Sequence, residues 1–117
     1  MVLLLLAVCA RTQQYVPLAS FENLSAGNTL IKVERRNDLI GAGQSVKISD
    51  NGRVVGSLSP GKYIIWQRPA GDFLLGIVPM FYGGPDSTPL NVLAEAGKQY
   101  NFRVYREGGT FKLEQQR

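Results

Sequence analysis

The residue types that most often carry catalysis are sparse in this sequence of 117 residues. There is no histidine, so Ser-His-Asp and Cys-His arrangements, which need an imidazole base, are excluded in their usual forms. Zinc sites built on histidine are excluded for the same reason, and one cysteine supplies neither a thiolate cluster nor an intrachain disulfide. We therefore predict no bound metal ion and no cofactor.

Carboxylates are the remaining candidates for acid–base chemistry. The ones considered are Asp50, Asp72, Asp86, Glu95 and Glu107. Each lies in or beside a predicted turn, where Asp commonly caps the backbone and Glu is solvated. A glycosidase needs two carboxylates that face each other across a cleft, and no spacing here indicates such a pair. The sequence thus predicts a protein that is not an enzyme, and an enzyme acting on an envelope polymer is kept as an alternative.

The charge pattern indicates a mildly basic, solvated surface. The net charge is +4, and Arg35-Arg36 is the only pair of adjacent basic residues. No run of Lys and Arg forms the stripe that nucleic-acid binding requires, so no nucleic-acid partner is predicted. The more specific alternative is a weak electrostatic attraction to an anionic membrane or a polysaccharide. The glycines of Gly41-Ala42-Gly43 do not form a phosphate loop, because no Lys-Ser/Thr pair follows, and we interpret them as a turn.

The first residues read MVLLLLAVCA, and the only cysteine, Cys9, directly follows Leu6-Ala7-Val8. This apolar run is too short to span a bilayer as a helix, which takes about 20 residues. It resembles the lipobox of bacterial lipoproteins, in which a Leu and two further residues precede an acylated Cys; Val8 stands where that family has Gly, Ala or Ser. The resemblance implies that Cys9 is lipidated and anchors the chain in a membrane. The alternative is a short apolar strand or helix with a buried free Cys.

Two groups of side chains are candidates for partner binding. Phe81 and Tyr82 precede a Gly-Gly-Pro stretch, and two adjacent rings cannot both point to the same face of a strand. An exposed ring there would contact an envelope protein or a polysaccharide, and the alternative is that one ring closes an open end of the core. Arg103, Tyr105 and Arg106 would add a basic and aromatic patch on the outward face of their strand.

Alternating apolar residues and turn signals predict about eight short strands. The expected strands are Thr29–Arg35, Val46–Asp50, Arg53–Leu58, Tyr63–Gln67 and Asp72–Met80, followed by strands that begin near Leu90, Tyr100 and Phe111. Asn51-Gly52 predicts a type I′ hairpin turn, and Gly108-Gly109 is a second hairpin signal. Tyr63–Gln67 is apolar on both faces and predicts a central strand. Trp66 needs a hydrogen-bond partner for its indole N–H if it is buried.

This spacing predicts an all-β fold, an antiparallel β-sandwich of Ig-like or PEGA-like type with seven to eight strands. We expect a leader over residues 1–9, a tether over 10–28 and the β-sandwich domain over 29–117. The predicted core consists of Ile31, Val33, Val46, Ile48, Val54, Ile64, Trp66, Leu74, Leu90, Val92, Tyr100, Phe102, Val104 and Leu113.

Four segments together resemble the bacterial DUF2846-type domain. They are Val46–Leu58, Pro60–Tyr63, Arg68–Gly71 and Leu90–Val104, the last containing AEAGKQYNFRV. The resemblance covers about residues 29–113, most of the mature chain, and implies a small β-sandwich, often an envelope lipoprotein, without a catalytic residue to transfer. The expected function is therefore binding or scaffolding by a lipid-anchored protein of the bacterial cell envelope, on the periplasmic face of a membrane or on the cell surface. A soluble interaction module without the anchor is the alternative.

Overall fold

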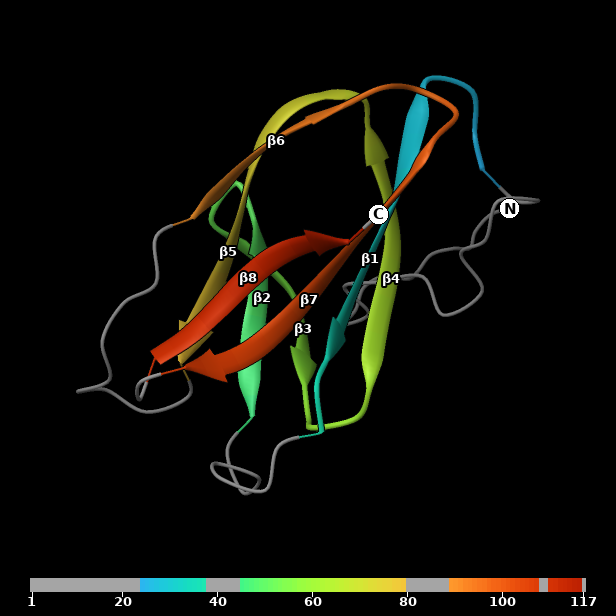
Figure 1. Cartoon of the computed structure of the whole chain (residues 1–117). Coiled ribbons are helices and arrows are strands. Elements are labelled where there is room, and N and C mark those ends of the chain that lie inside the picture. The colour runs from blue at the N-terminus through green and yellow to red at the C-terminus, as the bar shows by residue number, and fades with distance from the viewer. Residues whose placement is uncertain (1–23, 38–44, 80–88, 108–109, 117) are drawn as a thin grey trace, which may run out of the picture.

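The computed structural model describes residues 24–37, 45–79, 89–107 and 110–116, which form two packed β-sheets (Figure 1). The strands are β1 (Asn28–Arg35), β2 (Val46–Asp50), β3 (Arg53–Leu58), β4 (Tyr63–Pro69), β5 (Gly71–Pro79), β6 (Leu90–Ala94), β7 (Gln99–Glu107) and β8 (Thr110–Gln116). The described residues contain no helix. The predicted all-β sandwich is confirmed.

The strand order places four strands in each sheet. The first sheet has the order β4-β1-β7-β8 and the second has the order β3-β2-β5-β6. β1 and β7 run parallel, with Lys32 opposite Asn101, whereas the other strand pairs in the described residues are antiparallel. The prediction that the sandwich is antiparallel therefore does not hold for the β1–β7 pair. The parallel pair places residues from the two ends of the domain side by side at the centre of the first sheet.

The predicted hairpin between β2 and β3 is confirmed, together with the bounds of both strands. Asn51 has φ 52° and Gly52 has φ 83°, the pair of positive angles that a type I′ turn requires. The hairpin also contains a β-bulge, because Ile48 pairs with Gly56 while Ser49 pairs with Val54. Val55 is the extra residue, and a bulge of this kind reverses the alternation of the strand at that point.

Most of the predicted core residues are buried between the sheets or packed against the buried cluster. Two predictions are wrong. Val54 is only half-buried and Val55 is buried instead, because the bulge turns Val55 inward. Leu74 is 48% exposed on the outward face of β5, while its neighbours Phe73 and Leu75 point inward. Leu74 belongs to a run of apolar residues that occupies both faces of the strand, so the sequence pattern alone does not identify the buried face.

The prediction of a central strand at Tyr63–Gln67 is also wrong. β4 stands at one end of its sheet order and pairs with β1. Ile64 and Trp66 are buried, but Tyr63 is 59% exposed and Ile65 is half-buried. The apolar side chains of the outward face therefore lie at a sheet edge and are not covered by a second layer.

Several sequence predictions concern residues outside the described ranges. They involve Cys9, Gly41-Ala42-Gly43, Phe81, Tyr82 and Gly108-Gly109. Glu107 and Thr110, which flank the last of these, are opposite each other in the antiparallel β7–β8 pair. In the residues that the structure describes, no helix is long and apolar enough to cross a membrane.

Candidate binding surface on the first sheet

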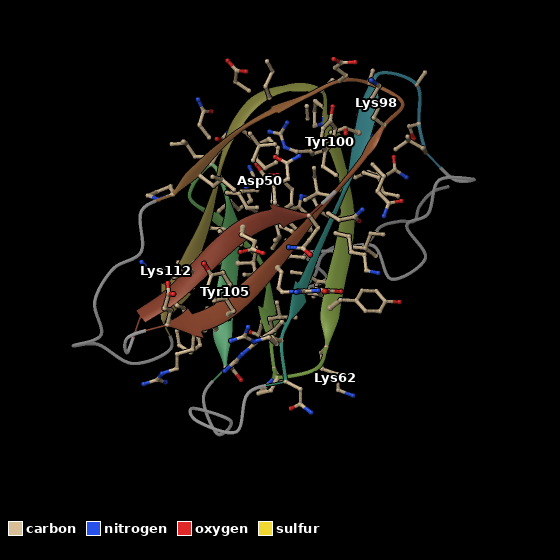
Figure 2. All side chains as sticks on the ribbon, viewed as in Figure 1. Asp50, Lys62, Lys98, Tyr100, Tyr105 and Lys112 are labelled. Atoms are coloured by element: carbon tan, nitrogen blue, oxygen red, sulfur yellow. The ribbon has the colours of Figure 1, made fainter. Side chains whose placement is uncertain are left out.

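The predicted patch of Arg103, Tyr105 and Arg106 is divided between two faces of β7. Arg103 and Tyr105 are two residues apart and lie on the outward face of the strand. Tyr105 lies beside Lys112 of β8 (Figure 2). Arg106 is opposite Phe111, which packs against the buried cluster, and its guanidinium lies 5.5 Å from the centre of the Phe111 ring. Successive side chains of a strand point to opposite faces, so the prediction that Arg106 shares the outward patch is wrong.

Tyr105 is not an isolated ring on this face. The guanidinium of Arg36 lies 5.5 Å from its centre, within the range of a cation–π contact. Arg36 extends β1, and its backbone N–H donates to the carbonyl oxygen of Val104 at 2.9 Å. The ring is therefore held between the end of β1 and β8.

A row of charged residues crosses three strands of the first sheet. Glu34 of β1 is opposite Arg103 of β7, which is opposite Glu114 of β8. Arg103 Nε donates to Glu34 Oε2 at 3.1 Å, and the two side chains are 38% and 40% exposed. At this exposure water screens the ion pair, so it orients the two side chains more than it stabilises the fold.

A row of polar residues lies next to the charged row and lines a recess. Lys32 is opposite Asn101, which is opposite Gln116. Together with Glu34, Gln99 and Phe102 they surround a recess of about 300 Å³. The recess thus takes side chains from three neighbouring strands, and five of its six residues are polar or charged.

Tyr63 stands beside this recess, at the β4 edge of the sheet. It is opposite Glu34 in the register, and Lys32 Nζ lies 4.5 Å from the centre of its ring. The ring is 59% exposed. Exposed aromatic rings beside a polar concavity are a common feature of binding surfaces, because one ring offers both an apolar face and a hydroxyl group.

No local sequence pattern singles out Lys32, Asn101, Gln116 or Tyr63. Their outward positions follow from strand alternation, but their proximity depends on the order β4-β1-β7-β8. Residues 32 and 101 become neighbours only through the parallel β1–β7 pair. A local pattern carries no signal for such a pairing.

A second polar cluster lies between the sheets and has a structural role. Asp50, at the end of β2, accepts hydrogen bonds at Oδ2 from Trp66 Nε1 (3.0 Å) and Arg68 Nε (2.8 Å). Arg68 also stacks on Phe73, with 4.1 Å between the guanidinium carbon and the ring centre. Asp50 is therefore the hydrogen-bond partner that the buried Trp66 indole requires, and it joins the two sheets.

The other described carboxylates do not gather into a site. Glu95 pairs with Lys98 at 3.0 Å in the exposed turn after β6, and its hydrogen bond raises the pKa of Lys98 above the ordinary value. Within the described ranges, no group of three or more Cys, Asp or Glu residues is arranged to hold a metal ion.

Comparison with known proteins adds evidence on the fold. No protein-family model matches the chain. No curated protein sequence matches it significantly. Among solved structures, the N-terminal domain of AlgF from P. aeruginosa is similar with a TM-score of 0.50 and 11% identity, over 81% of this chain and 100% of that domain. At this identity the similarity concerns the β fold alone.

Proposed function

We propose that the chain is a lipid-anchored binding or scaffolding protein of the bacterial cell envelope, without catalytic activity. The observation that carries the binding role is the outward face of the first sheet, where Lys32, Asn101 and Gln116 line a polar recess beside exposed Tyr63. A rigid sheet with directed polar side chains is a suitable platform for recognition, because little ordering entropy is lost on binding.

The anchor is supported by the resemblance of Leu6-Ala7-Val8-Cys9 to a lipobox. Ser25 donates its backbone N–H to Gln67 Oε1 at 3.0 Å, so the chain is attached to the first sheet from Ser25 onward. Residues 10–24 would reach at most about 50 Å when fully extended, at ~3.4 Å per residue. This reach lets the sandwich stand clear of a membrane surface, on the periplasmic face or on the cell surface.

Acyl labelling tests the anchor. The full chain is expressed in a bacterial host with a radioactive fatty acid, beside the variants Cys9→Ala and Val8→Ala. We expect label in the parent chain and in Val8→Ala, which has the small residue typical of a lipobox, and none in Cys9→Ala. An unlabelled parent chain refutes the anchor and favours the soluble interaction module.

Capture of envelope components by the full chain tests the binding role. The parent chain is compared with a Phe81→Ala/Tyr82→Ala variant and an Asn101→Ala variant. We expect Asn101→Ala to reduce capture, and a contribution of the predicted aromatic loop would appear as a loss in the first variant. If both variants capture as much as the parent chain, neither candidate surface takes part in binding.

A further inference from the structure

We infer that the recess on the outward face of β1, β7 and β8 binds a neutral sugar chain. The inference deepens the proposed binding role and does not depend on the anchor at Cys9. Four features of the recess support this ligand: its hydrogen-bonding groups, its charge balance, the exposed ring beside it and its position within the sheet.

The amide side chains of the recess offer donors and acceptors together. Gln99 Nε2 donates to Asn101 Oδ1 at 2.8 Å, and this bond orients both amides. Among the described residues, the Asn101 amide nitrogen and the Gln99 amide oxygen make no other side-chain hydrogen bond. One amide thus presents donors and its neighbour an acceptor. A hydroxyl group both donates and accepts, so a polyhydroxylated ligand can use the two together.

β8 and β1 also contribute hydrogen-bonding groups to the recess. Gln116 Nε2 donates to Glu114 Oε2 at 3.1 Å, which leaves its amide oxygen as an acceptor. Lys32 Nζ has no carboxylate within 4.0 Å among the described residues and adds further donors. Polar groups therefore face the recess from β1, β7 and β8, at the strand spacing of about 4.8 Å.

The charges around the recess are balanced and favour a neutral ligand. Glu34 and Glu114 oppose an anion, while Lys32 and Arg103 oppose a cation. Glu34 is moreover paired with Arg103 at 3.1 Å. A neutral glycan meets no net repulsion here and can hydrogen-bond to groups of both signs.

Tyr63 supplies the apolar contact that sugar recognition requires. A sugar ring has faces of C–H groups, which pack on aromatic rings while the hydroxyl groups point sideways. Lys32 Nζ lies 4.5 Å from the ring centre and holds the ring beside the recess, yet 59% of Tyr63 stays exposed. The sugar chain would therefore lie with one unit on Tyr63 and the next over Lys32 and Asn101.

The position of the recess favours a sugar chain over an extended peptide. β1 has neighbours β4 and β7, and β7 has neighbours β1 and β8, so both strands already use their backbone groups in the sheet. A peptide that binds by strand addition needs an unpaired sheet edge. A ligand that lies over β1 and β7 must therefore be recognised by side chains, whereas β8, which contributes Gln116, stands at the end of the sheet order.

Nuclear magnetic resonance of the full chain carrying Cys9→Ala, which cannot be acylated at that residue, tests the inference. The ¹⁵N-labelled protein is titrated with cellohexaose, hexa-N-acetylchitohexaose and maltohexaose up to millimolar concentration, and with polygalacturonate as the polyanionic comparison. We expect at least one of these neutral hexasaccharides to shift the signals of Lys32, Gln99, Asn101 and Gln116. Tyr63→Ala and Asn101→Ala should each weaken binding about fivefold, the size of one ring contact or one hydrogen bond.

The matched control is Asn91→Ala, an exposed asparagine of β6 in the second sheet, which should leave the affinity unchanged. If Asn101→Ala fails to fold, Gln99→Ala replaces it, because Gln99 is exposed. Three results would overturn the inference: no shift with any neutral hexasaccharide, a shift that Tyr63→Ala and Asn101→Ala both leave intact, or binding of polygalacturonate alone with an affinity that collapses as salt is raised. The two tests are independent: a negative titration does not bear on the acylation of Cys9, and a chain that is not acylated at Cys9 can still bind the sugar.

Discussion

Asp50 is the acceptor on which two donors between the sheets depend, so its removal should cost more than the loss of one hydrogen bond. Its Oδ2 lies 3.0 Å from Trp66 Nε1 and 2.8 Å from Arg68 Nε. Trp66 is 3% exposed, and the side chains of Arg68 and Asp50 are 12% and 13% exposed. In Asp50→Ala the indole N–H has no acceptor and the guanidinium has no counter-charge.

The magnitude follows from these two losses. An unsatisfied buried donor costs about 1–3 kcal/mol, and breaking a buried ion pair costs about 3–5 kcal/mol. The small exposure of Asp50 and Arg68 lets water compensate part of the second loss. We therefore expect Asp50→Ala to lower the free energy of unfolding by about 3 kcal/mol. Asp50→Asn keeps an acceptor for Trp66 and should cost about half as much.

Urea unfolding followed by the fluorescence of Trp66, the only tryptophan, measures these differences. The control is Asp72→Ala, an exposed carboxylate, which should change stability by less than about 0.5 kcal/mol. A double-mutant cycle with Arg68→Met, which retains an apolar contact to Phe73, isolates the ion pair. A loss below about 1 kcal/mol in Asp50→Ala, or no coupling between Asp50→Ala and Arg68→Met, would refute this reasoning.

Two further predictions concern the second sheet. A Cβ at Gly76 would lie 2.8 Å from Ser49 Oγ, so Gly76→Ala should cost about 1–2 kcal/mol, and adding Ser49→Ala should restore most of it; an equal loss in both backgrounds would refute the steric explanation. Val55→Ala should cost about 2 kcal/mol because Val55 is 6% exposed in the core, whereas Val54→Ala should cost less than about 1 kcal/mol. Urea unfolding measures both pairs, and equal losses at 54 and 55 would contradict the bulge.

Local signals in the sequence were sufficient for the strands and the hairpin but not for the buried faces. Asn51-Gly52 fixes its turn through residue chemistry that does not depend on the rest of the fold. The bulge beside it has no such signal, because Val54 and Val55 are the same residue type and either one satisfies the alternation. The pattern misplaces Leu74 in the core for a similar reason, since apolar residues flank it on both sides.

The candidate site depends on pairing between distant segments and could be predicted only in part. Alternation correctly gives Arg103 and Tyr105 the same face of β7, and the same rule places Arg106 on the other face. The neighbours of Arg103 could not be predicted from a local pattern, because Glu34 lies 69 positions earlier in the chain. Register between segments so far apart is set by the packing of the whole core and not by either segment.

The two outward faces of the sandwich differ in a way that bears on function. The second sheet exposes apolar side chains, with Leu74 at 48%, Val78 at 41% and Leu93 at 73%. The first sheet instead carries an ordered row of charges and a row of polar residues beside it. Solvation alone would not require the amides of Gln99 and Asn101 to be bonded to each other, or Arg103 to reach across to Glu34. Side chains that are held by one another on a rigid sheet lose little freedom when a ligand arrives. The order of this polar face is therefore the reason we propose the first sheet, and not the second, as the binding surface.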